Sequence, residues 1–77
     1  METKRERFVR LAENRTNKII NMVRLLGNCS NRSAYEYDKD DVQQIFTSIE
    51  EEVKNAKTKF LQADDHSQST FKLREKV

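Results

Sequence analysis

Two stretches of the chain carry apolar residues at alternating spacings of four and three, which places their side chains along one seam of a helix. The seam of the first stretch consists of Phe8, Ala12, Arg15, Ile19, Met22 and Leu26. The seam of the second stretch consists of Val42, Phe46, Ile49, Val53, Ala56 and Phe60. The pattern therefore predicts two amphipathic helices and an all-α chain.

Local capping signals set the ends of the first helix. Thr3 and Glu6 fit the capping box, in which each side chain accepts a hydrogen bond from the other residue's backbone N–H. Gly27 follows two leucines, and we expect it to end the helix in the left-handed conformation. These signals predict a helix over about residues 4–26.

The second helix is expected to begin after Asp38, which suits the N-cap position. Asp40 and Asp41 then fall in the first turn, near the positive end of the helix dipole. The apolar spacing predicts a helix over about residues 39–62. Beyond it the periodicity is lost, so we expect residues 64–77 to be a frayed tail or a short helix.

The two predicted helices match in period, so we expect an antiparallel hairpin over residues 1–63 with coiled-coil-like packing. Val9 and Ile20 extend the apolar surface of the first helix beyond what one partner helix covers. Two helices that bury one stripe each are only marginally stable. We therefore expect the hairpin to form a homodimer, as a four-helix bundle.

Arg15 interrupts the apolar seam of the first helix. In an antiparallel hairpin it comes level with Val53, which is flanked by Glu50 and Glu52. One hypothesis is an interhelical ion pair from Arg15 to Glu50 or Glu52 that fixes register and oligomeric state. The alternative is that the arginine stem lies along the seam and its head reaches water. The sequence leaves both open.

Composition supports helices, because the 77 residues include one Gly and no Pro. Charge is segregated along the chain. Residues 1–33 carry eight basic and three acidic side chains, residues 34–66 carry four and nine, and residues 67–77 carry three and one. The balances are +5, −5 and +2, so the two predicted helices attract each other.

No apolar run approaches the roughly 18 residues that span a bilayer, and the first residues lack an apolar signal core. Cys29 has no second cysteine to pair with. These features favour a cytoplasmic protein that makes no membrane contact.

Enzymatic chemistry finds little support in the residues. His66 is the single histidine, and no histidine is near Cys29 in sequence to act as a base. A structural zinc site takes about four Cys or His ligands, and the chain has two such residues in total. We expect no catalytic residues, no metal, no cofactor and no small-molecule substrate.

The face of the first helix opposite its apolar seam is basic and rich in amides. Its residues include Arg7, Arg10, Asn14, Asn17, Lys18 and Arg24. Arginine and asparagine commonly contact phosphates and base edges, so this face is a candidate surface for nucleic acid. The signal is weak, because Glu6 and Glu13 interrupt the face and aromatic residues are not interleaved with the basic ones.

The run from Arg24 to Tyr37, RLLGNCSNRSAYEY, together with the Asp41-Val42 and Ile45-Phe46 pairs and the opening KRERF, resembles a pattern in short uncharacterised bacterial proteins. Those proteins are often encoded on phages, plasmids and other mobile elements. The resemblance covers roughly residues 4–60 and implies no specific activity. By analogy it implies binding to another macromolecule, as anti-CRISPR inhibitors and other regulators of host machinery do.

The most distinctive part of this pattern is the predicted loop over residues 27–37. It displays polar and aromatic side chains that suit a protein partner, namely Asn28, Asn31, Arg32, Tyr35 and Glu36. The alternative is that loop side chains only cap the two helices. The leading interpretation of the sequence is a protein-binding regulator or inhibitor, with nucleic-acid binding as the second.

Overall fold

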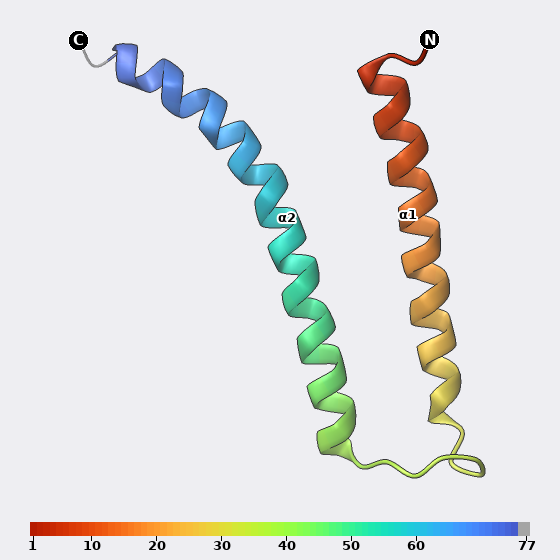
Figure 1. Cartoon of the computed structure of the whole chain (residues 1–77). Coiled ribbons are helices and arrows are strands. Elements are labelled where there is room, and N and C mark those ends of the chain that lie inside the picture. Colours follow the sequence, from red (N-terminus) through yellow and green to blue (C-terminus); the bar gives the residue numbers. More distant parts are fainter. Residues whose placement is uncertain (76–77) are drawn as a thin grey trace. The chain divides into compact units, whose positions relative to one another are not determined.

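The computed structural model contains two long α-helices joined by an irregular segment (Figure 1). Helix α1 runs over Lys4–Gly27, a 3-10 turn η1 over Asn28–Ser30, and helix α2 over Lys39–Glu75. The structure describes the backbone of residues 1–75 and the side chains of residues 1–64. The described backbone has no strand, which confirms the all-α class.

The chain divides into two units, Met1–Glu36 with α1 and η1, and Tyr37–Val77 with α2. The structure defines each unit separately. The antiparallel hairpin and the four-helix bundle therefore stay predictions.

Helix α1 begins as the sequence predicts. The backbone N–H of Thr3 donates to Glu6 Oε1 at 2.9 Å, and the backbone N–H of Glu6 donates to Thr3 Oγ1 at 3.0 Å. Both hydrogen bonds of the capping box are present, so two backbone donors at the open end of the helix are satisfied.

The end of α1 differs from the expectation. Gly27 has φ −59° and ψ −29°, which is right-handed helical geometry and not the left-handed conformation predicted for it. Asn28 is also right-handed, and its backbone N–H still donates to the carbonyl oxygen of Arg24. Because the hydrogen-bond ladder continues through Gly27, the helix tightens into η1 and does not reverse at the glycine.

Helix α2 begins at a pair of aspartates. The backbone N–H of Asp41 donates to Asp38 Oδ1 at 2.9 Å, and the backbone N–H of Asp38 donates to Asp41 Oδ2 at 3.0 Å. The predicted cap at Asp38 is confirmed, and Asp41 completes it in the manner of the glutamate of a capping box. Asp40 and Asp41 lie in the first turn, as expected.

Helix α2 continues to Glu75, beyond the expected end near residue 62. Most of the segment that the sequence predicts to be a frayed tail or a short helix is therefore a continuation of α2. The last residues of that segment, 76–77, lie outside the described residues.

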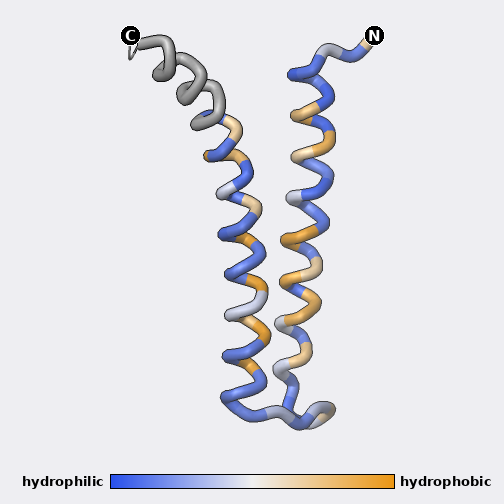
Figure 2. Tube along the Cα trace, turned by 60° about the vertical axis from the view of Figure 1, so that its left-hand side comes forward, coloured by the Kyte–Doolittle hydropathy of each residue, from blue (hydrophilic) through white to orange (hydrophobic). Residues whose placement is uncertain are grey.

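Apolar positions recur along both α1 and α2 (Figure 2). No described side chain, over residues 1–64, is buried. Large apolar side chains of both helices are exposed, namely Phe8, Ile19, Ile20, Met22, Val23 and Leu25 of α1 and Val42, Ile45, Phe46, Val53, Phe60 and Leu61 of α2. Each helix thus carries apolar surface that its own unit does not cover.

The right-handed geometry of Gly27 predicts that an alanine there stabilises the helix, whereas a left-handed glycine would predict the opposite. A Cβ added to Gly27 meets no atom within 4 Å, and the backbone is right-handed. Gly27→Ala should therefore stabilise α1 by up to about 1 kcal/mol, because alanine loses less backbone entropy in a helix. Circular dichroism during thermal denaturation measures the change, and a lower midpoint would contradict the right-handed geometry.

Candidate functional site

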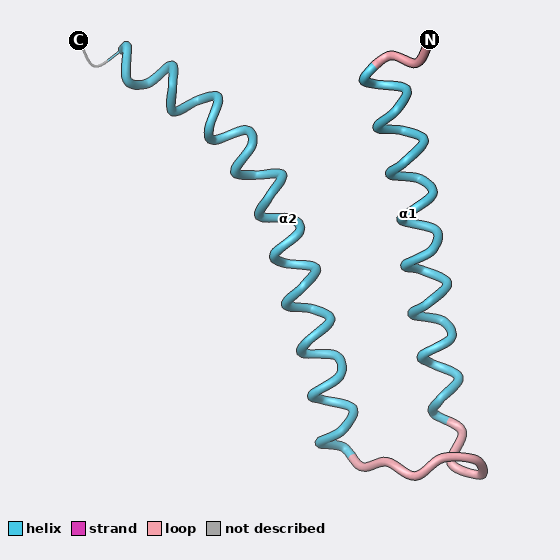
Figure 3. Tube along the Cα trace, viewed as in Figure 1, coloured by secondary structure: helices cyan, strands magenta, loops and turns pink. Residues whose placement is uncertain are grey.

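A loop joins α1 and α2 (Figure 3). Its hydrogen bonds centre on Asn31. The backbone carbonyl of Asn31 accepts hydrogen bonds from the N–H groups of Ala34 at 3.1 Å and Tyr35 at 3.0 Å. The side-chain Oδ1 of Asn31 accepts a third, from the N–H of Ser33 at 3.0 Å. An asparagine that hydrogen-bonds backbone two residues ahead forms an Asx turn. Asn31 therefore builds the turn, with its side-chain oxygen already engaged.

The predicted partner-binding residues of this segment are all exposed. Asn28 lies in η1, Arg32 lies within the Asx turn, and Tyr35 and Glu36 follow that turn. Tyr35 has 54% of its surface exposed, between the values of Phe8 at 48% and Phe60 at 64%. The two sequence interpretations of the segment thus apply to different residues, with Asn31 serving the turn while Tyr35 is presented to solvent.

The polar face of α1 is also exposed at each predicted position, namely Arg7, Arg10, Asn14, Asn17, Lys18 and Arg24. They all lie within α1, so one rigid helix presents them. An open hollow on the surface of α1 is lined by Arg10, Asn14 and Asn17 of this face together with Arg5, Glu6, Val9 and Glu13. The structure therefore brings an arginine and two amides of the predicted face together along one side of the helix.

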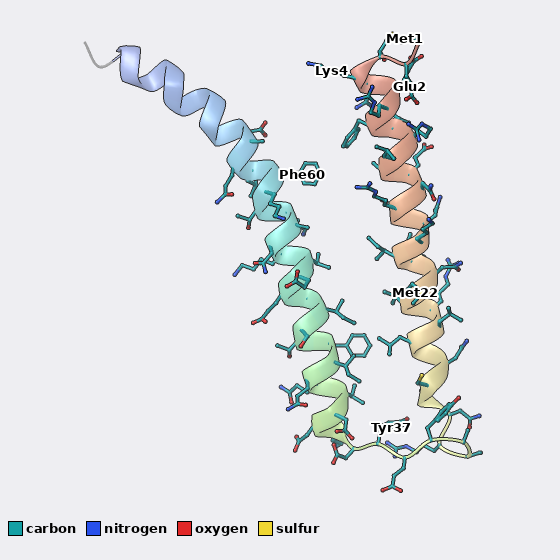
Figure 4. The ribbon with its side chains drawn as sticks, in the orientation of Figure 1. Met1, Glu2, Lys4, Met22, Tyr37 and Phe60 are labelled. Atoms are coloured by element: carbon teal, nitrogen blue, oxygen red, sulfur yellow. The ribbon has the colours of Figure 1, made fainter. Side chains whose placement is uncertain are left out.

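A carboxylate that the sequence did not single out lies against this face. Glu2 precedes α1 (Figure 4), and its Oε2 accepts a hydrogen bond from Arg10 Nε at 2.6 Å. Its Oε1 accepts a second from the terminal Nη2 of Arg10 at 3.0 Å and lies 3.9 Å from Arg7 Nε. Glu2 thus holds Arg10 through both carboxylate oxygens, the paired geometry that arginine forms with planar anions.

The contact shifts the ionisation of both partners. The hydrogen bonds from Arg10 lower the pKa of the Glu2 carboxyl, and desolvation opposes that change. The same bonds raise the pKa of the Arg10 guanidinium. Each shift favours the charged form, so both groups are ionised at neutral pH.

Sequence spacing gave no signal for Glu2. Ion pairs on a helix surface join residues three or four apart, whereas Glu2 and Arg10 are eight apart. The contact forms because residue 2 precedes the Thr3 cap and lies outside the helix. A glutamate before an N-cap with arginines in the next turns is the signal that could have found it.

The proposed register residues lie in different units. Arg15 is exposed on α1, and Glu50 and Glu52 are exposed on α2. Their ion pair stays a prediction. On the edge assigned to dimerisation, Ile20 is exposed and Val9 is partly covered within its own unit.

Chemical groups for catalysis or metal binding are sparse in the described part of the chain. Cys29 is an exposed free thiol, and His66 lies outside the described side chains. Among the described residues, no group of three or more His, Cys, Asp or Glu could hold a metal ion. Among the described helices, none is both long enough and apolar enough to cross a bilayer.

Comparison with known proteins adds no relative. No family model, no curated protein and no solved structure matches this chain.

The structure offers three candidate surfaces. They are the exposed segment around Asn31, the polar face of α1 with its Glu2 contact, and the apolar seams of both helices.

The Glu2 contact predicts how this carboxyl titrates. Because its pKa is lowered by Arg10, the stabilisation from the pair is complete above the ordinary glutamate pKa and is lost as pH falls through the lowered value. Arg10→Gln should raise the titration midpoint of Glu2, measured by carboxyl-detected NMR. Arg24→Gln removes an arginine from the same helix and should leave that midpoint unchanged. Equal midpoints in the wild type and Arg10→Gln would rule out the contact.

Proposed function

We propose that this chain is a non-enzymatic protein-binding module of the regulator or inhibitor type. The supporting observation is the apolar surface on both helices, which is exposed within each unit. In proteins, most of the stability of an amphipathic helix comes from packing of its apolar face. Both helices therefore need a helical or protein partner.

In this proposal the two helices cover each other first. Their seams share the same spacing. Residues 1–33, with eight basic and three acidic side chains, have a balance of +5, and residues 34–66, with four and nine, have a balance of −5. Opposite charges favour pairing of α1 with α2 over pairing of two like helices. The edge with Val9 and Ile20 then takes a second copy, which completes a four-helix bundle.

The exposed segment around Asn31 is the surface that meets the regulated partner. An Asx turn fixes its backbone, which lowers the entropy cost of binding, and Tyr35 supplies an exposed aromatic side chain of the kind that dominates protein interfaces. The mobile-element setting and an anti-CRISPR-like role rest on the sequence resemblance alone.

A second candidate function is nucleic-acid binding by the polar face of α1. It is favoured by the exposure of every predicted residue of that face on one helix, while α2 bears the acidic segment. The apolar seam lies on the opposite side of α1, but Val9 of the dimer edge lines the same hollow as Arg10, Asn14 and Asn17. Dimerisation and nucleic-acid binding would therefore use neighbouring surfaces.

Single substitutions separate the hairpin from the dimer. Ile20→Ser should weaken self-association at least about tenfold while leaving helical content unchanged, because it removes buried apolar surface only from the dimer contact. Ile19 lies on the seam, so Ile19→Ser should weaken self-association and also lower the helical content. Asn21→Ser, on the polar face, should change neither.

Sedimentation equilibrium over a range of micromolar concentrations gives the mass, and circular dichroism gives the helical content. A wild-type protein that stays monomeric throughout that range would refute the four-helix bundle. Equal behaviour of the Ile19 and Ile20 variants would refute the assignment of these two residues to different contacts.

The role of the loop predicts which side chains a bound partner depends on. Tyr35→Ala and Arg32→Ala should each reduce recovery of a partner captured from bacterial lysate by at least about tenfold, as expected for residues central to an interface. Gln44→Ala changes an exposed polar residue of α2 and should have no effect. Recovery that is unaffected by Tyr35→Ala and Arg32→Ala would place the partner surface elsewhere.

A further inference from the structure

The contact between Glu2 and Arg10 shows what kind of group the polar face of α1 accepts. Two carboxylate oxygens of Glu2 take hydrogen bonds from Arg10 at 2.6 and 3.0 Å, and Arg7 lies 3.9 Å from one of them. A carboxylate and a phosphodiester each present two equivalent oxygens to the fork of a guanidinium. The two arginines therefore form a site shaped for one anion, which Glu2 occupies.

The occupant is held at the surface and can exchange. The side chains of Arg7 and Arg10 are 61% and 58% exposed, and that of Glu2 is 33% exposed. Exposed ion pairs are weak because water and salt screen them. A second anion that is fixed in place by further contacts can therefore displace Glu2.

Further contacts of this kind lie along the same face. Asn14 and Asn17 line the hollow that also includes Arg5, Val9, Arg10 and the carboxylates of Glu6 and Glu13. Arg24 lies on the same face near the other end of α1. At about 1.5 Å of rise per residue, Arg7 and Arg24 are roughly 25 Å apart along the helix. Neutral amides between two arginine positions suit a polymer of repeated phosphates, since amides donate to phosphate and sugar oxygens.

We propose that the Arg7 and Arg10 pair binds the phosphate backbone of a nucleic acid and that Glu2 is an internal competitor for this site. The inference rests on the second candidate function and adds its regulation. When Glu2 is in place, it neutralises one end of the basic face. When a nucleic acid binds, its phosphate replaces the carboxylate and Glu2 moves into solvent.

The test compares Glu2→Gln with a variant that has the same net charge. Glu51→Gln also removes one negative charge, but Glu51 is exposed on α2 and lies in the other unit. Fluorescence anisotropy of a labelled DNA duplex, titrated with each protein at several salt concentrations, gives the affinities and the salt slopes. Circular dichroism confirms that each variant keeps its helices.

Glu2→Gln should bind the duplex about two- to fivefold more tightly than Glu51→Gln at low salt, the range expected when one exposed ion pair no longer competes. Its salt slope should be steeper by about one, because one more arginine is free to neutralise a phosphate. In an Arg10→Gln background the advantage of Glu2→Gln over Glu51→Gln should disappear.

The contrary outcomes are distinct. Equal binding by Glu2→Gln and Glu51→Gln would overturn the competition but leave nucleic-acid binding standing. Absence of duplex binding by every variant at low salt would overturn both. If polyglutamate, tested as an unlabelled competitor, displaces the duplex at equal or lower charge concentration, the site would instead belong to acidic proteins and the proposed ligand would be wrong.

Discussion

The constraint that governs this molecule is that its helices satisfy their backbone groups locally and leave their apolar side chains uncovered. The starts of α1 and α2 are each closed by two reciprocal side-chain hydrogen bonds. No side chain over residues 1–64 is buried. Caps contribute about 1 kcal/mol each, far less than burial of a full apolar stripe. The helices are thus well defined locally, while stability depends on what covers their seams.

The separation of surfaces around α1 gives this small chain room for more than one contact. The seam with Phe8 and Ile19 occupies one side of the helix, and Arg7 and Arg10 lie on the other. Packing on the seam leaves the arginines accessible. The guanidinium of Arg5 lies 5.8 Å from the centre of the Phe8 ring, a cation–π contact with the first residue of the seam.

The helix starts could be predicted because their signals lie within one turn. Thr3 with Glu6, and Asp38 with its aspartates, need only the next three residues to form their hydrogen bonds. The end of α1 could not be fixed in this way, because glycine accepts both left- and right-handed geometry and Gly27 adopts the latter. Helix α2 ends later than the apolar periodicity predicts, because loss of that periodicity removes a packing face without breaking a helix. No Gly or Pro follows Gly27 to break it.

The candidate surfaces also divide into features that the sequence predicts and features that only the structure shows. The exposed polar face of α1 follows from helical geometry alone, whereas the Glu2 contact depends on how the chain folds back before Thr3. In the loop, the sequence predicts that Asn31 is one of several residues displayed to a partner, whereas the structure shows that Asn31 holds the turn. Which residue builds a turn and which is presented depends on backbone direction, and the residue types leave that direction undetermined.

Cys29 gives the loop a practical consequence. Its thiol is exposed in the 3-10 turn that follows α1, and it is the only cysteine of the chain. A nitroxide attached there needs no other residue to be replaced. In a dimer of hairpins, the separation of two such spin labels would be short if the loops lie at the same end and long if they lie at opposite ends. The distance between labels on this one native side chain would thus distinguish the two topologies of the assembly.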